Sequence, residues 1–139
     1  MRGPALAVRL LVTIPGNPWA GRINARDRAA VKRDGTPYNR KRPGFAAYQE
    51  QVRLAALQAR RAQQVAFGLD LVEVWISLWV PDRRRRDIDG PIKALLDGLT
   101  VAEVWADDQQ VWALHVRKHL GAARATVRVA RLTERARAC

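Results

Sequence analysis

Two stretches of the chain carry the pattern of β-strands. Residues 5–14 (ALAVRLLVTI) are rich in aliphatic and β-branched side chains and end at the turn-forming segment 15–18, so we predict a first strand there. Residues 69–80 (LDLVEVWISLWV) alternate between an aliphatic set and a mixed polar and aromatic set, and stop at Pro81. This alternation predicts a second strand with one buried face.

Two further stretches have helical periodicity. Residues 45–65 carry apolar side chains at spacings of three and four, many of them alanine, which predicts an amphipathic helix with a small-residue face. A second helix should begin at Gly90-Pro91, since proline is tolerated in a first helical turn. Its predicted core-facing stripe is Ile92, Leu95, Leu96 and Leu99, and it should end between Leu99 and Glu103.

Residues 111–119 and 125–132 read as two more strands joined around Gly121, which predicts an antiparallel pair. No internal repeat and no linker divides the chain. The pattern therefore predicts one α+β domain over residues 1–139, with about four strands and two main helices.

Residues 17–44 show no sustained apolar period and hold prolines at 18, 37 and 43. A long connection of this kind is usually functional or disordered. Trp19 and Tyr38 either stack on unpaired bases or pack over the core as a lid. We predict phosphate contacts from the basic residues of this segment, chiefly Lys32, Arg33, Arg40, Lys41 and Arg42.

The composition indicates a folded protein with a polyanionic partner. The chain has 139 residues, 48% of them hydrophobic, and 25 Lys+Arg against 13 Asp+Glu, for a net charge of +12. Nucleic acid is the first candidate, and an arginine-rich solvated surface is the alternative. The single cysteine, Cys139, excludes an intramolecular disulfide and cysteine-based zinc motifs. The chain lacks a signal-peptide pattern and an apolar run of ~18 residues, so we expect a cytoplasmic protein without a membrane span.

The charge is unevenly distributed. Between Asp82 and Asp108 lie seven of the acidic residues and only five basic ones, so this segment is net −2 while the remainder is +14. Within it, Asp87 and Asp89 are two apart. In an extended segment their Cα atoms are about 6.6 Å apart on one side, within reach of a hard cation. Alternatively, Asp89 caps the helix and Asp87 neutralises a neighbouring arginine.

A second acidic pair, Asp107-Asp108, comes just before the third predicted strand. If the helix packs beside the second strand, the chain returns toward that strand and three acids can converge. Three carboxylates suit Mg²⁺ or Mn²⁺. Lys93 is placed to reach a nucleic-acid phosphate bound at such a metal site. Alternatively, it forms an ion pair with Asp97. His115 and His119 lack partners at ligand spacing, so we treat them as ordinary surface or packing residues.

Segment 81–111, PDRRRRDIDGPIKALLDGLTVAEVWADDQQV, resembles the RusA family of Holliday junction resolvases, crossover junction endodeoxyribonucleases often found in phages and prophages. The family order is a basic run, a D-hydrophobic-D pair, a lysine four residues on, a hydrophobic helix with L-D-x-L, a tryptophan, and D-D before the next strand. Each piece alone is common, but the ordered combination is specific. Weaker similarity reaches Lys118 and the turn at 14–17, whereas loop 18–44 is not covered.

The resemblance implies a RusA-like mixed sheet and a homodimer that resolves four-way DNA junctions by symmetric nicks. It implies Mg²⁺, with Mn²⁺ as the expected substitute, held by Asp87, Asp89 and Asp108. Lys93 is implied to assist at the phosphate and so completes the predicted catalytic set. DNA contacts are implied for the basic run, which is Arg83, Arg84, Arg85 and Arg86. The expected location is the cytoplasm at the nucleoid, as a host, phage or prophage product.

Two positions depart from the family pattern. Gly90 stands where the family usually has asparagine, which removes a side chain that would support the metal ligands. Glu103 stands where a glycine commonly precedes the tryptophan, which alters the turn ahead of Asp107. The predicted Mg²⁺-dependent endodeoxyribonuclease therefore has two rivals: a non-catalytic basic DNA- or RNA-binding protein, and an inactive family member that only binds junctions.

Overall fold

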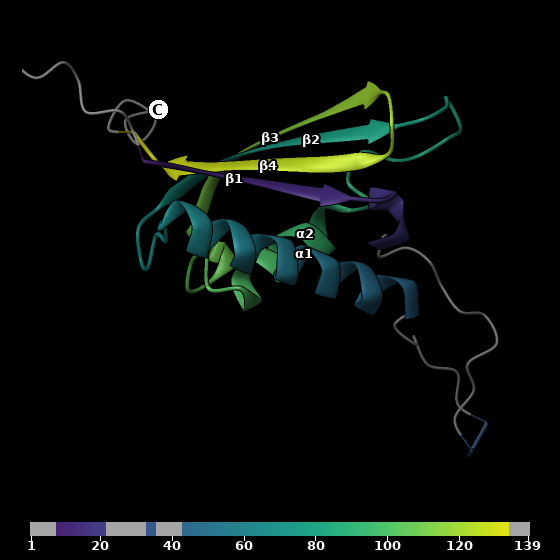
Figure 1. The fold of residues 1–139 in the computed structure, drawn as a ribbon. Coiled ribbons are helices and arrows are strands. Elements are labelled where there is room, and N and C mark those ends of the chain that lie inside the picture. The colour runs from purple at the N-terminus through teal and green to yellow at the C-terminus, as the bar shows by residue number, and fades with distance from the viewer. Residues whose placement is uncertain (1–7, 22–32, 36–42, 134–139) are drawn as a thin grey trace, which may run out of the picture.

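The computed structural model describes residues 8–21, 33–35 and 43–133 (Figure 1). It confirms the predicted α+β class, with one four-stranded mixed sheet and two main helices. The strands are β1 (Arg9–Pro15), β2 (Val72–Val80), β3 (Val111–Leu120) and β4 (Arg124–Arg131). The helices are α1 (Pro43–Gln63) and α2 (Ile92–Val101), and two 3-10 turns are η1 (Pro18–Gly21) and η2 (Asp108–Gln110).

The strand order in the sheet is β1-β4-β2-β3, with β3 parallel to β2 and β4 antiparallel to both β1 and β2. The predicted antiparallel pairing of the last two strands is therefore wrong, because β2 lies between them. The helix α2 serves as a crossover that returns the chain parallel to β2. The chain then passes the end of β2, where the backbone N–H of Gly121 donates to the carbonyl of Val80 at 2.8 Å.

The predicted element bounds agree with the structure to within a few residues. The helix predicted over 45–65 runs from 43 to 63, and the strand predicted over 69–80 runs from 72 to 80. Residues 5–7 of the first predicted strand lie outside the described residues, as does most of the connection predicted over 17–44. Its described beginning is the turn η1.

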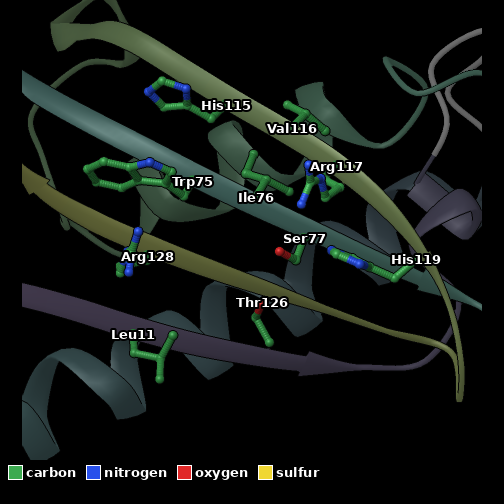
Figure 2. A pocket seen from close by; sticks show the side chains of 10 residues that line it. All are labelled: Leu11, Trp75, Ile76, Ser77, His115, Val116, Arg117, His119, Thr126 and Arg128. Atoms are coloured by element: carbon green, nitrogen blue, oxygen red, sulfur yellow. The ribbon is translucent and has the colours of Figure 1, made fainter.

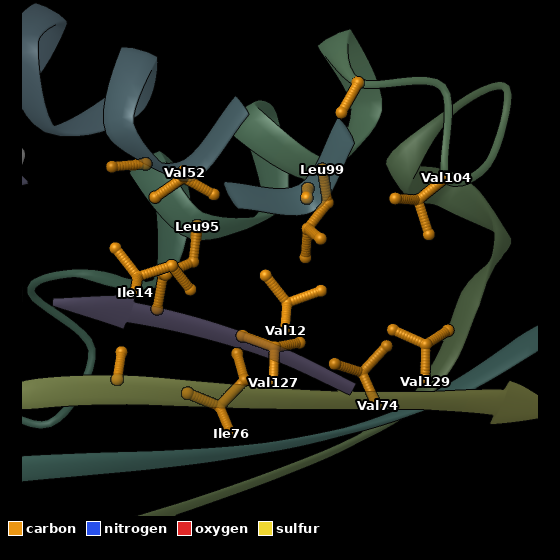
Figure 3. Close-up of a cluster of buried hydrophobic side chains, with 14 of the residues drawn as sticks. Val12, Ile14, Val52, Val74, Ile76, Leu95, Leu99, Val104, Val127 and Val129 are labelled. Atoms are coloured by element: carbon orange, nitrogen blue, oxygen red, sulfur yellow. The ribbon is translucent and has the colours of Figure 1, made fainter. Parts of the chain in front are cut away.

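The core lies between the sheet and the two helices, which cover one face of the sheet (Figures 1 and 3). The aliphatic set of β2 is buried at every second position, which confirms its predicted buried face. Hydrophobic burial at about 25 cal/mol per Å² is the main stabilising contribution to such a two-layer domain. None of the described helices lies on the other face of the sheet (Figure 1).

The buried face of α2 differs from the predicted stripe. Leu95 and Leu99 are fully buried, but Ile92 and Leu96 are only partly buried. Ala94 and Gly98 are buried as well, and an added Cβ atom at Gly98 would lie 2.5 Å from a methyl group of Val52 in α1. The missing side chain lets the two helices approach closely, so the small residue lies in the interface and the larger ones lie beside it.

Within the described residues, none of the helices has the length and apolar character needed to cross a membrane.

Candidate active site

Residues 81–91 connect the end of β2 to the start of α2. We call this segment the acidic loop after Asp87 and Asp89, which follow its four arginines. Asp87 and Asp89 are both exposed on it. Neither carboxylate forms a hydrogen bond or ion pair with another described residue. Their backbone carbonyls hold the loop instead: that of Asp87 accepts from the N–H of Gly90 at 3.1 Å, and that of Asp89 accepts from Ile92 at 3.2 Å.

The two structural alternatives for these carboxylates are not observed. α2 has no side-chain N-cap hydrogen bond, so Asp89 does not cap the helix. The nearest candidate partner for Asp87, Arg86, donates to Asp82 instead, with 2.7 Å between Nη1 and Oδ1. The loop thus presents two carboxylates without a partner among the described residues, in a protein with excess positive charge.

One arginine of the basic run is nearly buried and makes structural contacts, whereas the others are exposed. The Arg86 side chain is only 12% exposed, and its hydrogen bond to Asp82, together with the backbone N–H of Arg84, lowers the pKa of the Asp82 carboxyl below its usual range. Arg83 and Arg85 are exposed. The run borders a hollow of about 240 Å³ beside the end of β3, where Lys118 donates to the carbonyl of Arg86 at 2.7 Å.

Trp19, which lies 68 residues before Asp87 in the sequence, fixes the acidic loop. Its indole Nε1 donates to the carbonyl of Asp87 at 2.9 Å, and its side chain is 6% exposed. Gly90 is buried beneath the same ring, since a Cβ atom there would lie 3.0 Å from the indole nitrogen. Trp19 therefore packs as a lid rather than presenting a face for base stacking, and its ring fills the space that a side chain at position 90 would need.

The two residues of the second acidic pair, Asp107 and Asp108, have different roles. Asp107 is the N-cap of η2: its Oδ1 accepts from the N–H of Gln109 at 2.9 Å, in a capping box with Gln110. Gln110 is 6% exposed, and its Nε2 donates to the carbonyls of Gly68 and Asp70, both at 2.8 Å. These bonds tie the turn to the connection between α1 and β2, so Asp107 has a structural function.

Asp108 faces α2. Its Oδ2 lies 3.8 Å from the Nζ of Lys93, which also pairs with Oδ1 of Asp97 at 2.9 Å. The predicted alternative for Lys93, an ion pair with Asp97, is therefore present, but the structure also brings Lys93 to Asp108. The hydrogen bond to Asp97, with a smaller effect of Asp108, raises the pKa of Lys93 above its usual range. Lys93 is a cation at neutral pH and not a proton acceptor.

The donor chemistry of these residues fits a divalent ion, although no cage is preformed. Exposed carboxylates without protein partners are the ligands that Mg²⁺ and Mn²⁺ prefer. Within residues 8–21, 33–35 and 43–133, no group of three or more His, Cys, Asp or Glu side chains is gathered closely enough to hold a metal. The convergence of three acids thus stays a prediction, and a metal would have to draw the acidic loop and Asp108 together.

The remaining predicted DNA contacts lie in the long connection. Arg33 is exposed in a turn. Lys32, Arg40, Lys41 and Arg42 lie outside the described residues, as does Tyr38.

Glu103 occupies the position at which the helix α2 ends. Its φ of 60° is left-handed, its N–H donates to Thr100 O at 3.0 Å, and the N–H of Val104 donates to Leu99 O at 3.1 Å. This is the Schellman arrangement, in which glycine is favoured. The departure from the family pattern therefore leaves the turn ahead of Asp107 intact and adds backbone strain.

Three features of the site were missed from the sequence. Gln110 could have been found as the last residue of an Asp-x-x-Gln capping box. The bond from Trp19 to Asp87 joins positions 68 residues apart and leaves no sequence signal. His115 and His119 agree with the prediction of surface or packing residues, but their tryptophan partners, Trp75 and Trp79, were missed. The equal four-residue spacing in both strands was the available signal.

Residues 15–130 match the family described as Endodeoxyribonuclease RusA. The crossover junction endodeoxyribonuclease rusA of Enterobacteria phage 82 is 37% identical over 75 residues, which are 53% of this chain and 62% of that protein. The RusA proteins of Escherichia coli K12 and Shigella sonnei Ss046 are each 52% identical over 40 residues, 29% of this chain and 33% of theirs. The matches thus span about three-fifths of the phage protein and a third of the other two.

Proposed function

Because this chain belongs to the RusA endodeoxyribonuclease family, we propose that it is a metal-dependent endodeoxyribonuclease that resolves four-way DNA junctions. The observation that carries this proposal is the acidic loop, where Asp87 and Asp89 present carboxylates that no described residue neutralises. Beside them, Arg83 and Arg85 offer exposed cations to the DNA backbone. Phosphate attraction and metal ligation thus come from one loop.

Each residue has a separate role in this proposal. Asp87, Asp89 and Asp108 hold Mg²⁺, with Mn²⁺ as a substitute. Such an ion supplies an activated water and positive charge at the scissile phosphate. Lys93 binds and orients that phosphate as a cation, since its raised pKa keeps its proton in place. Asp97 holds Lys93 in position at 2.9 Å.

Asp108, rather than Asp107, is the third ligand. The Asp107 carboxylate is engaged in the cap of η2, whereas Asp108 points toward Lys93. The capping box and the Gln110 bonds fix the turn that carries Asp108, so its position relative to α2 is set by the fold and not by a free loop.

The proposed partners are branched DNA and a second copy of the chain. Resolving a junction needs matched nicks in two strands of like polarity, and a two-fold dimer presents one site to each. DNA contacts come from Arg83, Arg84 and Arg85 and from the basic residues of the 17–44 connection. Arg86 contributes mainly through its ion pair with Asp82 and not through a DNA contact of its own. The proposed activity places the protein with DNA, in the cytoplasm of a bacterial host.

The test replaces single carboxylates by isosteric amides. Asp89→Asn should lower cleavage of a synthetic four-way junction by roughly 100-fold or more, because a metal ligand is lost. Binding in EDTA should persist, because the DNA contacts remain. Asp107→Asn is the matched control, since asparagine caps a helix about as well as aspartate, and it should cut normally.

The outcomes separate the proposal from its two rivals. A non-catalytic nucleic-acid-binding protein, or an inactive family member, binds the junction but makes no nicks that depend on Mg²⁺. Undiminished cutting by Asp89→Asn, or equal loss in Asp107→Asn and Asp108→Asn, would contradict the assigned ligand set.

A further inference from the structure

The face of the sheet that the helices leave uncovered has a regular construction. The strand register aligns its outward residues in four rows that each cross all four strands. In the order β1, β4, β2, β3, the rows are Arg9, Ala130, Glu73, Ala113; Leu11, Arg128, Trp75, His115; Thr13, Thr126, Ser77, Arg117; and Pro15, Arg124, Trp79, His119. We call this surface the open sheet face.

The second and fourth rows form two ridges. In one, the Arg128 guanidinium lies 4.5 Å from the Trp75 ring centroid, and His115 stacks on the ring's other side at 5.4 Å. In the other, Arg124 lies 4.0 Å from the Trp79 centroid and His119 stacks at 4.7 Å. Both faces of each tryptophan are thus occupied by an arginine and a histidine from the neighbouring strands.

The third row is a furrow between the ridges. It consists of three short hydroxyl side chains and ends at Arg117, and a hollow of about 500 Å³ opens over it (Figure 2). Residues four apart in a strand are about 13 Å apart, which sets the spacing of the ridges. That width is narrower than a DNA duplex and accommodates the backbone of one strand.

The charge of the open sheet face is one-sided. The four rows contain four arginines and a single acidic residue, Glu73, which lies 2.7 Å from Nε2 of His115. Arg117 is exposed and forms no hydrogen bond or ion pair with another described residue. A second copy docked here by a two-fold axis would bring two arginine-rich surfaces of the same charge together, which like-charge repulsion opposes.

We propose that this furrow binds the sugar-phosphate backbone of one DNA strand, as a contact surface separate from the acidic loop. Hydroxyl and guanidinium donors are the groups that contact phosphate oxygens, and stacking on the tryptophan faces is blocked by their arginine and histidine neighbours. The ridge at Trp79 lies next to the end of β2, where the acidic loop begins. This inference rests on the proposed function for its choice of branched DNA as the nucleic acid.

The test measures binding of a fluorescent four-way junction and of a single-stranded oligonucleotide in EDTA, across a range of salt concentrations. Arg117→Gln should weaken junction binding about threefold and reduce the slope of log K against log salt by about 0.7 to 0.9, the value for one phosphate contact. Arg117→Gln/Arg128→Gln should reduce the slope by about twice that. Arg61→Gln, which removes an exposed arginine from α1, is the matched control and should bind like the wild type.

Affinities and slopes of the furrow variants equal to those of Arg61→Gln would overturn the inference. So would a change in the mass of the protein by sedimentation in Arg117→Gln alone, because it would identify the face as a contact between copies. The proposed function is tested separately. If the wild type makes no Mg²⁺-dependent nicks but Arg117→Gln still weakens junction binding, the nuclease activity is contradicted and the DNA contact in the furrow is supported.

Discussion

Replacing Trp19 by phenylalanine tests how the acidic loop is held. The change removes the donor to the Asp87 carbonyl, a bond of 2.9 Å at a side chain only 6% exposed. A lost hydrogen bond costs about 1 kcal/mol, and the smaller ring leaves a cavity that adds about 1 to 2 kcal/mol. We expect a loss of about 2 to 3 kcal/mol in the free energy of unfolding, measured by urea denaturation.

The effect on the metal distinguishes loop positioning from general destabilisation. Because the bond fixes the backbone of a proposed ligand, Trp19→Phe should raise the Mg²⁺ concentration needed for half-maximal junction cleavage by about 10-fold. Trp105→Phe is the matched control. Trp105 is 1% exposed and donates from Nε1 to Thr100 Oγ1 at 2.8 Å, at the other end of α2. It should destabilise the protein similarly but leave the Mg²⁺ requirement unchanged.

The positioning role of Trp19 is wrong if both variants shift the Mg²⁺ requirement equally, or if neither does so while both lose stability. Either result would mean that the indole of Trp19 supports the core and not the ligand loop.

Three further predictions concern stability. Glu103→Gly should raise the free energy of unfolding by about 1 kcal/mol in urea denaturation, because φ is 60° there; a loss would contradict the strain. Gly98→Ala should lower it by about 1 to 3 kcal/mol, because the new Cβ would lie 2.5 Å from a methyl group of Val52; a gain from helix propensity would show that α1 and α2 separate freely. The hydrogen bond from Arg86 lowers the pKa of Asp82, so its contribution is present above the unfolded pKa and lost as pH falls through the folded value. Asp82→Asn should flatten the decline in Tm below about pH 4, the ordinary pKa of an aspartate; an unchanged decline would count against this.

The local structure was predictable where a single segment determined it. The alternation of β2 and the periodicity of α1 follow from burial of one face, and both were placed within three residues. The order of acids, arginines and lysine between residues 81 and 111 indicated the family, because an ordered motif can be matched without knowing which distant residues are in contact.

The pairing of strands was not predictable in the same way. The short connection around Gly121 favours a hairpin, but the crossover through α2 puts β3 beside β2 and displaces β4 to the other side. The rows of the open sheet face depend on that order. The four-residue spacing of Trp75 and Trp79 was visible in the sequence, but the histidines and arginines that stack on them are fixed only by the register.

Most contacts around the candidate site were not predictable from the sequence. Three-dimensional packing explains Gly90, because the Trp19 ring occupies the space beside it. It also distinguishes Asp108 from Asp107, since only the latter caps η2. The packing of Trp19 on Gly90 does not follow from spacing along the chain, whereas the Asp-x-x-Gln spacing from Asp107 to Gln110 was a signal for the cap.

The most direct test of the central claim is to map the nicks that the wild-type protein makes in a synthetic four-way junction, with Mg²⁺ and with EDTA. The proposed function predicts paired nicks at symmetric positions in two strands of like polarity, present with Mg²⁺ and absent with EDTA. Junction binding without any Mg²⁺-dependent nick, or nicks in one strand alone, would contradict it.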